Sequence, residues 1–401
     1  MKLGILRKHQ YWLWLLGLEI GLVLIAVFML VHPEIFPMHG FTGPAMPSEL
    51  PETIRLTGDS WRYISGGSAI LYGVPLDDIQ ASYLGYCLVC GLAGGGLVAV
   101  QVMAAMVALA AVAAVGRRLG GPSCGILAGA LFALNPELGA WHCAVMTESL
   151  YTSCVCINAF LALWALEAKR PRFRMAAVFL FMVLTAFLRP TGWIQLPAVL
   201  IFWSCSRVRG IRWKLALSAA IAAVFVVLAV TGGSSRIQSE SPAVKLYRGE
   251  VVWQEELWRV SMPPADGYGP SMADGMRYGL RHPLASGWLV LKRLGVMALR
   301  IRPSYSLPHN LFLMAYHFPV ALLGILALFL CRKSAAVWCI AAFVAAHALV
   351  VALTFNDNDG RFTLYFTPIL AAAAVGAALA LFKRYGNRTA DDGASSSAAG
   401  Q

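Results

Sequence analysis

Apolar runs of about twenty residues recur along the chain, and this feature limits the possible folds more than any other. A run of roughly 20 apolar residues crosses the hydrocarbon layer of a bilayer as one helix. Hydrophobic residues make up 59% of the 401 positions and charged residues only 13%, a composition unlike that of soluble globular domains. The sequence therefore predicts an all-α polytopic membrane protein.

We place the spans near 11–31, 80–116, 122–139, 148–167, 173–188, 191–206, 213–231, 308–330, 334–354 and 361–382. The run at 80–116 is long enough for two helices and has a glycine-rich break at 91–96, so the total is ten or eleven. The distribution of basic residues favours a single crossing at 80–116. The basic clusters between spans then all fall on the side of Lys2, Arg7 and Lys8, as the positive-inside rule requires.

The charge pattern also assigns the two sides of the membrane. The net charge of +12 comes mostly from loops beside anionic lipid headgroups, so it does not indicate a nucleic-acid partner. Apart from Glu19, Glu167, Asp391 and Asp392, the acidic residues fall on the opposite, outer side. We therefore expect a multi-pass protein of the bacterial inner membrane, with both termini in the cytoplasm and the acidic chemistry on the periplasmic side.

Residues 1–382 form the predicted transmembrane domain, with larger outer loops at about 32–78 and 232–308. Residues 383–401 form a cytoplasmic tail. From Gly386 onward this tail is rich in Ala, Ser and Gly, and it is predicted to be disordered because it cannot bury enough apolar surface.

Within the second outer loop, 283–300 predicts an amphipathic helix that lies flat in the membrane interface. Its apolar residues are set against Lys292, Arg293 and Arg300. Together with Arg302, these cations are candidates for binding a phosphate on the outer side.

The polar stretch 57–73 lies between very apolar segments, just after the first span. It places Asp59 near Arg62 and Tyr63, where a reacting group would meet both lipid and water. Asp59 and Arg62 are three positions apart and share a face if the stretch is helical. The alternative is that Asp59 only caps a short interfacial helix, since Asp is a favoured N-cap residue.

Glu148 falls at the outer start of a span. An ionisable side chain at that depth is costly and needs a partner or a function, but an acid there is also favoured by the helix dipole, so both interpretations stay open. Glu137 follows Asn135 and Pro136 and is interpreted as part of a turn. Asp59 and Glu148 together could hold a divalent metal, although no metal is required.

Arg189 and Arg361 both fall at membrane depth on the outer side, where cations are less favoured. Guanidinium groups suit phosphate oxygens, so the functional interpretation is anion capture. The alternative for each is snorkelling or pairing with Asp357 and Asp359.

Short motifs follow one another in a recognisable order over most of residues 1–382. They are Asp59 with Tyr63, Thr147 to Tyr151 after Asn135-Pro136, Arg189-Pro190 with Gly192, His282-Pro283 before the basic amphipathic helix, and Arg361-Phe362 followed by Pro368. In this order they resemble the glycosyltransferase C superfamily, most closely the protein O-mannosyltransferases and the lipid A aminoarabinose transferases.

The resemblance implies transfer of a sugar from a polyprenyl-phosphate carrier to a glycan, lipid or protein on the outer face, with inversion at the anomeric carbon. It also implies that Asp59 acts as general base or positions the acceptor hydroxyl. Ser60 stands where the protein mannosyltransferases have Glu after this Asp, which leaves the acceptor open.

The residues suit that chemistry by themselves. One carboxylate must reach the attacking hydroxyl, and fixed positive charge must meet the leaving phosphate. Asp59 and Glu148 supply carboxylates, and among the cations we favour Arg361 and Arg62. If so, Asp59 and Arg361 must lie close together at one cleft. The rival interpretations are a lipid or solute transporter or flippase, and an oligosaccharide ligase that uses a pyrophosphate-linked donor.

Overall fold

A computed structural model describes residues 2–32, 56–57, 59–168, 171–208, 210, 212–213, 216, 219–221, 241–253, 255–302, 305–357 and 360–398. These residues form helices joined by turns, and within them no strand occurs beyond one isolated bridge between Val252 and Asn356. The predicted all-α class is confirmed for this part of the chain.

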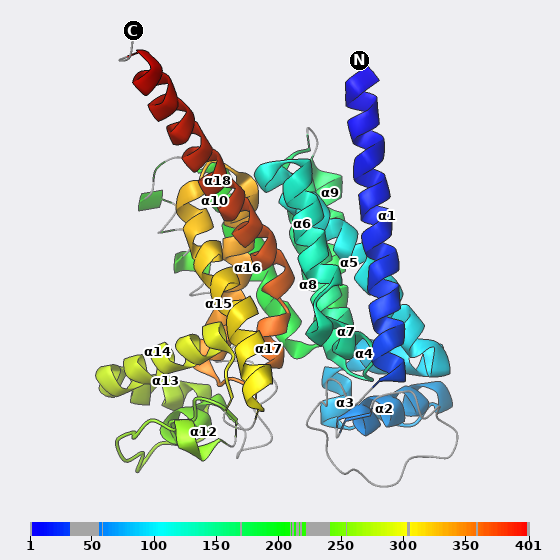
Figure 1. The fold of residues 1–401 in the computed structure, drawn as a ribbon. Helices are drawn as coiled ribbons and strands as arrows, with labels where there is room; N and C mark the ends of the chain where they lie inside the picture. The colour runs from blue at the N-terminus through cyan, green and yellow to red at the C-terminus, as the bar shows by residue number, and fades with distance from the viewer. Residues whose placement is uncertain are drawn as a thin grey trace.

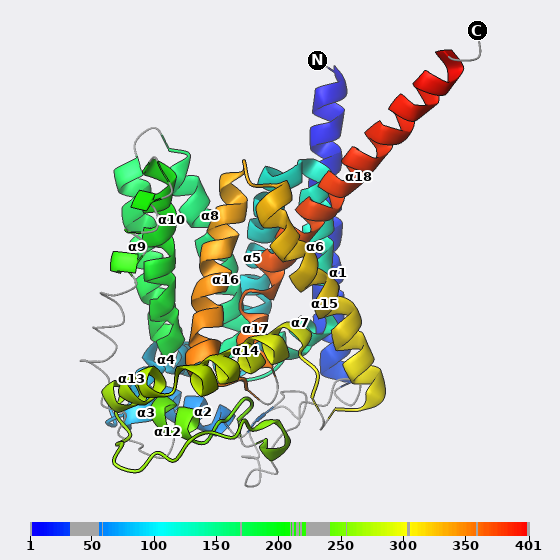
Figure 2. The ribbon, with the colours of Figure 1, turned by 90° about the vertical axis from the view of Figure 1, so that its left-hand side faces the viewer.

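Long helices stand side by side and make up the body of the molecule (Figures 1 and 2). They are α1 (Lys2–Val31), α5 (Leu97–Gly120), α8 (Thr147–Leu166), α9 (Pro171–Leu188), α10 (Gln195–Arg207), α15 (Leu307–Leu330), α16 (Ala335–Leu353) and α18 (Thr367–Ala398). Shorter helices extend or connect them: α4 (Leu84–Ala93), η1 (Gly94–Gly96), α6 (Pro122–Ala133), α7 (Pro136–His142), η2 (Pro190–Ile194) and α17 (Arg361–Leu364).

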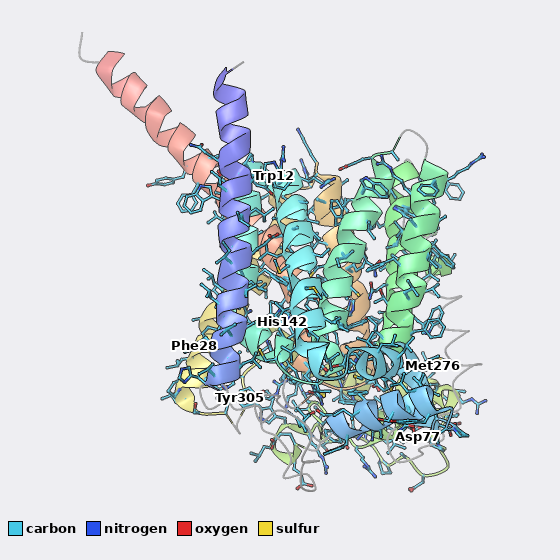
Figure 3. All side chains as sticks on the ribbon, turned by 90° about the vertical axis from the view of Figure 1, so that its right-hand side faces the viewer. Trp12, Phe28, Asp77, His142, Met276 and Tyr305 are labelled. Atoms are coloured by element: carbon cyan, nitrogen blue, oxygen red, sulfur yellow. The ribbon has the colours of Figure 1, made fainter. Side chains whose placement is uncertain are left out.

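A second set of helices lies across one end of this bundle (Figures 1 and 2). It consists of α2 (Ser60–Tyr72), α3 (Asp78–Ser82), α12 (Pro242–Tyr247), η4 (Glu256–Trp258), α13 (Met272–Arg281) and α14 (Pro283–Leu299). The helix predicted at 283–300 is therefore present as α14. Figure 3 labels Asp77 and Met276 at this end, which we call the covered end.

Six helical segments of the described residues are long and apolar enough to cross a membrane, or seven if the bent pair α6 and α7 forms one span. One of them is the continuous segment Leu84–Gly120, in line with the single crossing favoured by charge. The predicted total of ten or eleven also counted α9 and α10, whose 18 and 13 residues lie at and below the short end of the range for a crossing helix. The span predicted at 213–231 lies almost wholly outside the described residues, as do 33–55 of the first loop.

Both termini lie at the end opposite the covered end (Figure 1). The last turns of α5 and α8 meet there, because Arg118 is paired with Glu167. The turn before α16 joins them, since the Ser334 hydroxyl donates to the Arg118 carbonyl at 3.4 Å. Basic turns far apart in sequence thus share one end, as the charge pattern predicts. The assignment of that end to the cytoplasm stays a prediction.

The tail prediction needs a correction. The helix α18 continues through the stretch that we expected to be disordered and ends at Ala398. A helix that is already nucleated in an apolar span gains one hydrogen bond for each added residue without a new nucleation cost, and Ala is the best helix former.

Close packing of glycines fixes where α2 lies. A Cβ at Gly67 would come within 2.6 Å of the Gly91 nitrogen, and one at Gly91 within 2.7 Å of the Gly67 carbonyl oxygen. Only glycines allow α2 and α4 to approach this closely. The contact holds α2 across the covered end, with its first turn directed to the start of α8.

Candidate active site

The start of α2 is tied to the segment that precedes α8. The Ser60 hydroxyl accepts a hydrogen bond from the Thr57 nitrogen at 2.7 Å and donates one to the Val145 carbonyl at 2.9 Å. The Thr57 hydroxyl lies 2.8 Å from the sulfur of Met146. These bonds place Asp59, which immediately precedes α2, beside the first turn of α8.

Asp59 occupies the N-cap position of α2, but its side chain makes no capping hydrogen bond. The carboxylate is instead directed at two arginines. Its Oδ1 lies 3.2 Å from Nη1 of Arg62, and its Oδ2 lies 3.6 Å from Nη1 of Arg361. Asp59 and Arg361 are therefore close together, as the predicted cleft requires.

Arg361 begins α17 and connects Asp59 to the interior. Its Nε and Nη2 donate to the two carboxylate oxygens of Asp357 at 2.6 and 3.0 Å. Its Nη1 also lies 3.8 Å from Oε1 of Glu148, and its guanidinium lies over the Trp141 ring at 6.0 Å. The predicted pairing with Asp357 is thus present together with the contact to Asp59. Asp359 lies outside the described residues.

Glu148 and Arg189 form the buried floor of this site. Arg189 follows α9, and its Nη1 donates at 2.7 Å both to Oε1 of Glu148 and to the Thr147 hydroxyl. Glu148 lies in the first turn of α8, so it has both a partner and a position favoured by the helix dipole. The two interpretations of Glu148 are compatible.

Aromatic rings complete the floor. The Tyr365 hydroxyl donates to Oε1 of Glu148 at 3.3 Å, and the Arg189 guanidinium lies 5.1 Å from the Tyr365 ring centre and 5.5 Å from that of Phe362. Tyr365 therefore contacts both members of the buried ion pair.

Tyr63 lies one turn after Asp59 on α2 and is buried against the Tyr83 and Tyr86 rings, with ring centres 5.3 and 5.0 Å apart. Burial raises its pKa far above the usual tyrosine value. The predicted substrate-binding residue is thus a packing residue of α2 in this structure.

We call Asp59, Arg62, Glu148, Arg189 and Arg361 the acid–arginine cluster. Exposure falls in steps across it. The side chains of Asp59 and Arg62 are 38% and 39% exposed, that of Arg361 is 16% exposed, and those of Arg189 and Glu148 are 9% and 0% exposed. A ligand would therefore reach Asp59 and Arg62 first, then one edge of Arg361.

The cations predicted on the basic face of 283–300 do not join this cluster. The Arg293 guanidinium is buried and donates to the carbonyls of Glu250 and Ala352, both at 2.9 Å. Burial lowers its pKa to about 10, with the Glu250 carboxylate opposing the change, so Arg293 stays charged at neutral pH. Lys292 is exposed and lies 5.9 Å from the Trp288 ring centre.

Arg300 is also buried, and its side chain turns away from the predicted basic face. It ends α14 in a left-handed conformation with φ of 57°. Its guanidinium is paired with both carboxylate oxygens of Glu137 and lies 2.8 Å from Nε2 of His317. We call these three residues the buried triad. The interpretation of Glu137 as turn chemistry was wrong, because Asn135 supplies the cap of α7 and Glu137 binds Arg300.

The buried triad and Arg302 support the loop that carries Arg361. Gly360 has φ of 65°, and a Cβ there would lie 2.7 Å from Nε of Arg300. Arg302, which was also predicted on the basic face, donates from Nη2 to the Asp357 carbonyl at 3.0 Å. Arg300 and Arg302 therefore support the loop that carries Arg361, whereas Lys292 stays exposed on α14.

Sequence reasoning missed Tyr365 and Trp141. Tyr365 stands four residues after Arg361, and this spacing is the signal that could have indicated it. No such signal exists for Trp141, which comes from another helix.

A metal between Asp59 and Glu148 stays a prediction. Both carboxylates face one Arg361 nitrogen, and the part of the chain that the structure describes holds no group of three or more His, Cys, Asp or Glu side chains placed to share an ion.

The cluster combines an accessible carboxylate, two guanidinium groups within 4 Å of it and a buried ion pair that fixes one of them. Such a set can accept a proton and hold an anion in adjacent positions. Comparisons with known proteins add no identification: no protein-family model matches this chain, and no curated protein matches it either.

Proposed function

We propose that this protein is a membrane glycosyltransferase that moves a sugar from a polyprenyl-phosphate-linked donor to an acceptor hydroxyl at the covered end. The observation that carries the proposal is the position of Arg361, whose Nη1 lies within 4 Å of the accessible Asp59 and the buried Glu148. The resemblance of the motif order to the glycosyltransferase C superfamily supports it.

In this proposal the donor phosphate binds Arg361 and Arg62. Without donor, Asp59 bridges these two guanidinium groups. A phosphate offers more anionic oxygens to the same groups and displaces the Asp59 carboxylate, since charge-assisted bonds to guanidinium are among the strongest hydrogen bonds in proteins. The displaced carboxylate then turns to the acceptor. Donor binding thus frees the Asp59 carboxylate to act as the general base.

The chemical step is one displacement. Asp59 takes the proton of the acceptor hydroxyl, and the acceptor oxygen forms a bond to the anomeric carbon on the face opposite the phosphate. The bond from that carbon to the phosphate oxygen breaks, and its electron pair leaves with the polyprenyl phosphate. Arg361 and Arg62 stabilise the charge that grows on the leaving phosphate. The anomeric configuration inverts.

The apolar surroundings suit a lipid-linked donor. The polar cluster lies where α2, η2 and α17 meet the ends of the long apolar helices, and an acyl or prenyl chain can lie along those helices. A soluble nucleotide sugar has no lipid chain and would make no contact with these apolar helices. The proposal therefore names polyprenyl phosphate as the carrier, with hexose and pentose both as candidates for the sugar.

The test uses purified protein in proteoliposomes with polyprenyl-phosphate mannose and polyprenyl-phosphate aminoarabinose as donors. Asp59→Asn keeps the shape and removes the base, so turnover should fall about 10²- to 10⁴-fold while the folded yield is unchanged. Asp266→Asn changes another exposed acid and is the matched control.

Near-normal turnover of Asp59→Asn would remove Asp59 from the mechanism. Transfer from a polyprenyl-pyrophosphate donor alone would identify the ligase alternative, and net accumulation of lipid or solute without transfer would identify a transporter.

A further inference from the structure

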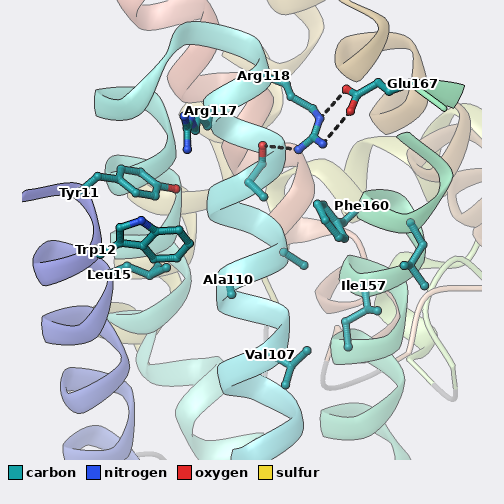
Figure 4. Close-up of a pocket in the computed structure, with 13 residues that line it drawn as sticks. Tyr11, Trp12, Leu15, Val107, Ala110, Arg117, Arg118, Ile157, Phe160 and Glu167 are labelled. Carbon is teal, nitrogen blue, oxygen red and sulfur yellow. Dashed lines mark hydrogen bonds and ion pairs between the residues drawn. The ribbon is translucent and has the colours of Figure 1, made fainter. Parts of the chain in front are cut away.

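A hollow lies at the opposite end of the molecule from the acid–arginine cluster. It is a cavity of about 730 Å³ between α1, α5 and α8, within the size range of small-ligand sites (Figure 4). Most of its wall is apolar, formed by Trp12, Leu15, Val107, Ala110, Ala111, Ala114, Ile157, Phe160 and Leu161. We call it the α1–α5–α8 groove.

The groove is open on its side, between two helices that can cross a membrane. Trp12 is 53% exposed and Val107 57% exposed although both line it. Both residues belong to helices that are candidate membrane spans. Bilayer lipid therefore has direct lateral access to this groove, whereas a soluble ligand would have to enter through its polar end.

Polar residues gather at the end of the groove where α5 finishes. Arg118 donates to both oxygens of Glu167 at 2.6 and 2.8 Å and to the Ala114 carbonyl, as the dashed lines in Figure 4 show. Arg117 is exposed, and its guanidinium lies over the Tyr11 ring at 5.3 Å. Within the described residues, no acid is paired with Arg117. The rim thus carries two guanidinium groups and one carboxylate, with an excess of positive charge.

We propose that the α1–α5–α8 groove binds an anionic phospholipid from the leaflet at the end where both termini lie. One acyl chain occupies the apolar wall, and the phosphate meets Arg117 at the rim. Basic pockets between transmembrane helices bind anionic headgroups in this way, and aromatic residues such as Tyr11 and Trp12 favour the same depth. The proposal does not depend on the sugar-transfer reaction, because it uses none of its residues.

The experiment is native mass spectrometry of the full-length protein in detergent, titrated with dioleoylphosphatidylglycerol and, separately, with dioleoylphosphatidylcholine. We expect the anionic lipid to be retained at lower concentration than the zwitterionic one. Arg117→Gln should weaken phosphatidylglycerol binding about fivefold, which is the contribution of one basic side chain at an anionic surface.

Two further variants separate charge from shape. Ala110→Leu fills the apolar wall without changing charge and should lower phosphatidylglycerol retention at least as much as Arg117→Gln. Among the described residues that line the groove, Glu167 is the only acid. Glu167→Gln removes it and releases Arg118, so binding should become about fivefold tighter. A gain for phosphatidylglycerol without a matching gain for phosphatidylcholine separates this effect from misfolding, because exposed apolar surface would bind both lipids.

Arg172→Gln is the matched control, because Arg172 is an exposed arginine in the first turn of α9 at the same end and does not line the groove. It should leave binding within twofold of the unmodified protein. Equal retention of the two lipids, equal loss in Arg172→Gln and Arg117→Gln, or unchanged retention in Ala110→Leu would each overturn the proposal.

Discussion

The acid–arginine cluster and the buried triad use the same residue types in opposite ways. Both join a glutamate near the start of one helix to an arginine that is distant in sequence. In the buried triad the side chains of Glu137, Arg300 and His317 are at most 9% exposed. In the acid–arginine cluster, exposure rises from the fully buried Glu148 to the half-buried Asp59.

This difference indicates which cluster can accept a ligand. A closed set of buried charges is satisfied internally, and removing one member leaves an uncompensated charge. A set that extends to the surface can exchange its outermost carboxylate for another anion without exposing the inner pair. We therefore propose a structural role for the buried triad and a functional role for the acid–arginine cluster, and the following variants test that division.

The largest effect on stability is expected in the buried triad. Arg300→Gln leaves the Glu137 carboxylate buried without its main partner, so the free energy of unfolding should fall by about 3–5 kcal/mol. Thermal unfolding in detergent would measure the change. The double variant Glu137→Gln with Arg300→Gln should recover part of the loss, because neither charge is then left alone. Normal stability of the single variant would contradict a structural role.

A substitution in the floor of the acid–arginine cluster should also lower the free energy of unfolding, but by less than Arg300→Gln does. Glu148→Gln leaves Arg189 with the Thr147 hydroxyl and the Tyr365 and Phe362 rings, so we expect a loss of about 3 kcal/mol. Asp59→Asn, in the same unfolding measurement, should change stability by no more than about 0.5 kcal/mol, because its pair with Arg62 is exposed and Arg361 keeps Asp357 as a partner. Equal losses in the two variants would erase the distinction between floor and surface.

For Arg361 we expect a main effect on donor binding and a smaller effect on stability. Arg361→Lys keeps the charge, but an ammonium cannot hold both oxygens of Asp357 and face Asp59 at once. Donor affinity should fall about tenfold, roughly 1.4 kcal/mol, with a smaller change in stability. Binding of a polyprenyl-phosphate donor to the reconstituted variant measures this. Unchanged donor affinity would assign Arg361 to structure, together with Arg300.

The smallest effects on stability and on donor binding are expected for Arg62, at the surface of the cluster. The pair between Arg62 and Asp59 is exposed and three residues apart, so Arg62→Gln should cost less than about 1 kcal/mol of stability. Its effect on donor binding should be a few-fold and should diminish as salt is raised, since exposed charges are screened. A salt-independent effect on donor binding would place Arg62 deeper in the site than its exposure indicates.

The local sequence pattern was sufficient to predict some of the residues of the candidate site. Asp59, Arg361, Glu148 and Arg189 stood out because each is an ionisable residue beside an apolar run, where an unpaired charge is costly. Their common location followed from the expectation that all lie at the same end of their spans. The pairing geometry did not follow, since it depends on how the helices rotate against one another.

The same reasoning failed for Arg293 and Arg300. Both appeared to lie on a polar helix face, because the helical pattern records only which residues share a face and not what covers that face. The partner of Arg300 is Glu137, 163 positions away in sequence. A left-handed residue at the end of α14 directs the side chain inward, and nothing in the local pattern specifies this.

The sequence by itself determined the helical class, the apolar segments that can cross a membrane and the grouping of basic turns at one end. These follow from composition and from the cost of placing polar groups in hydrocarbon, which act on each segment separately. Only the tertiary structure decided which carboxylate meets which guanidinium and which of these pairs water can reach. Those outcomes depend on contacts between segments hundreds of residues apart, and the free energy of an ion pair depends on its burial rather than on its residue types.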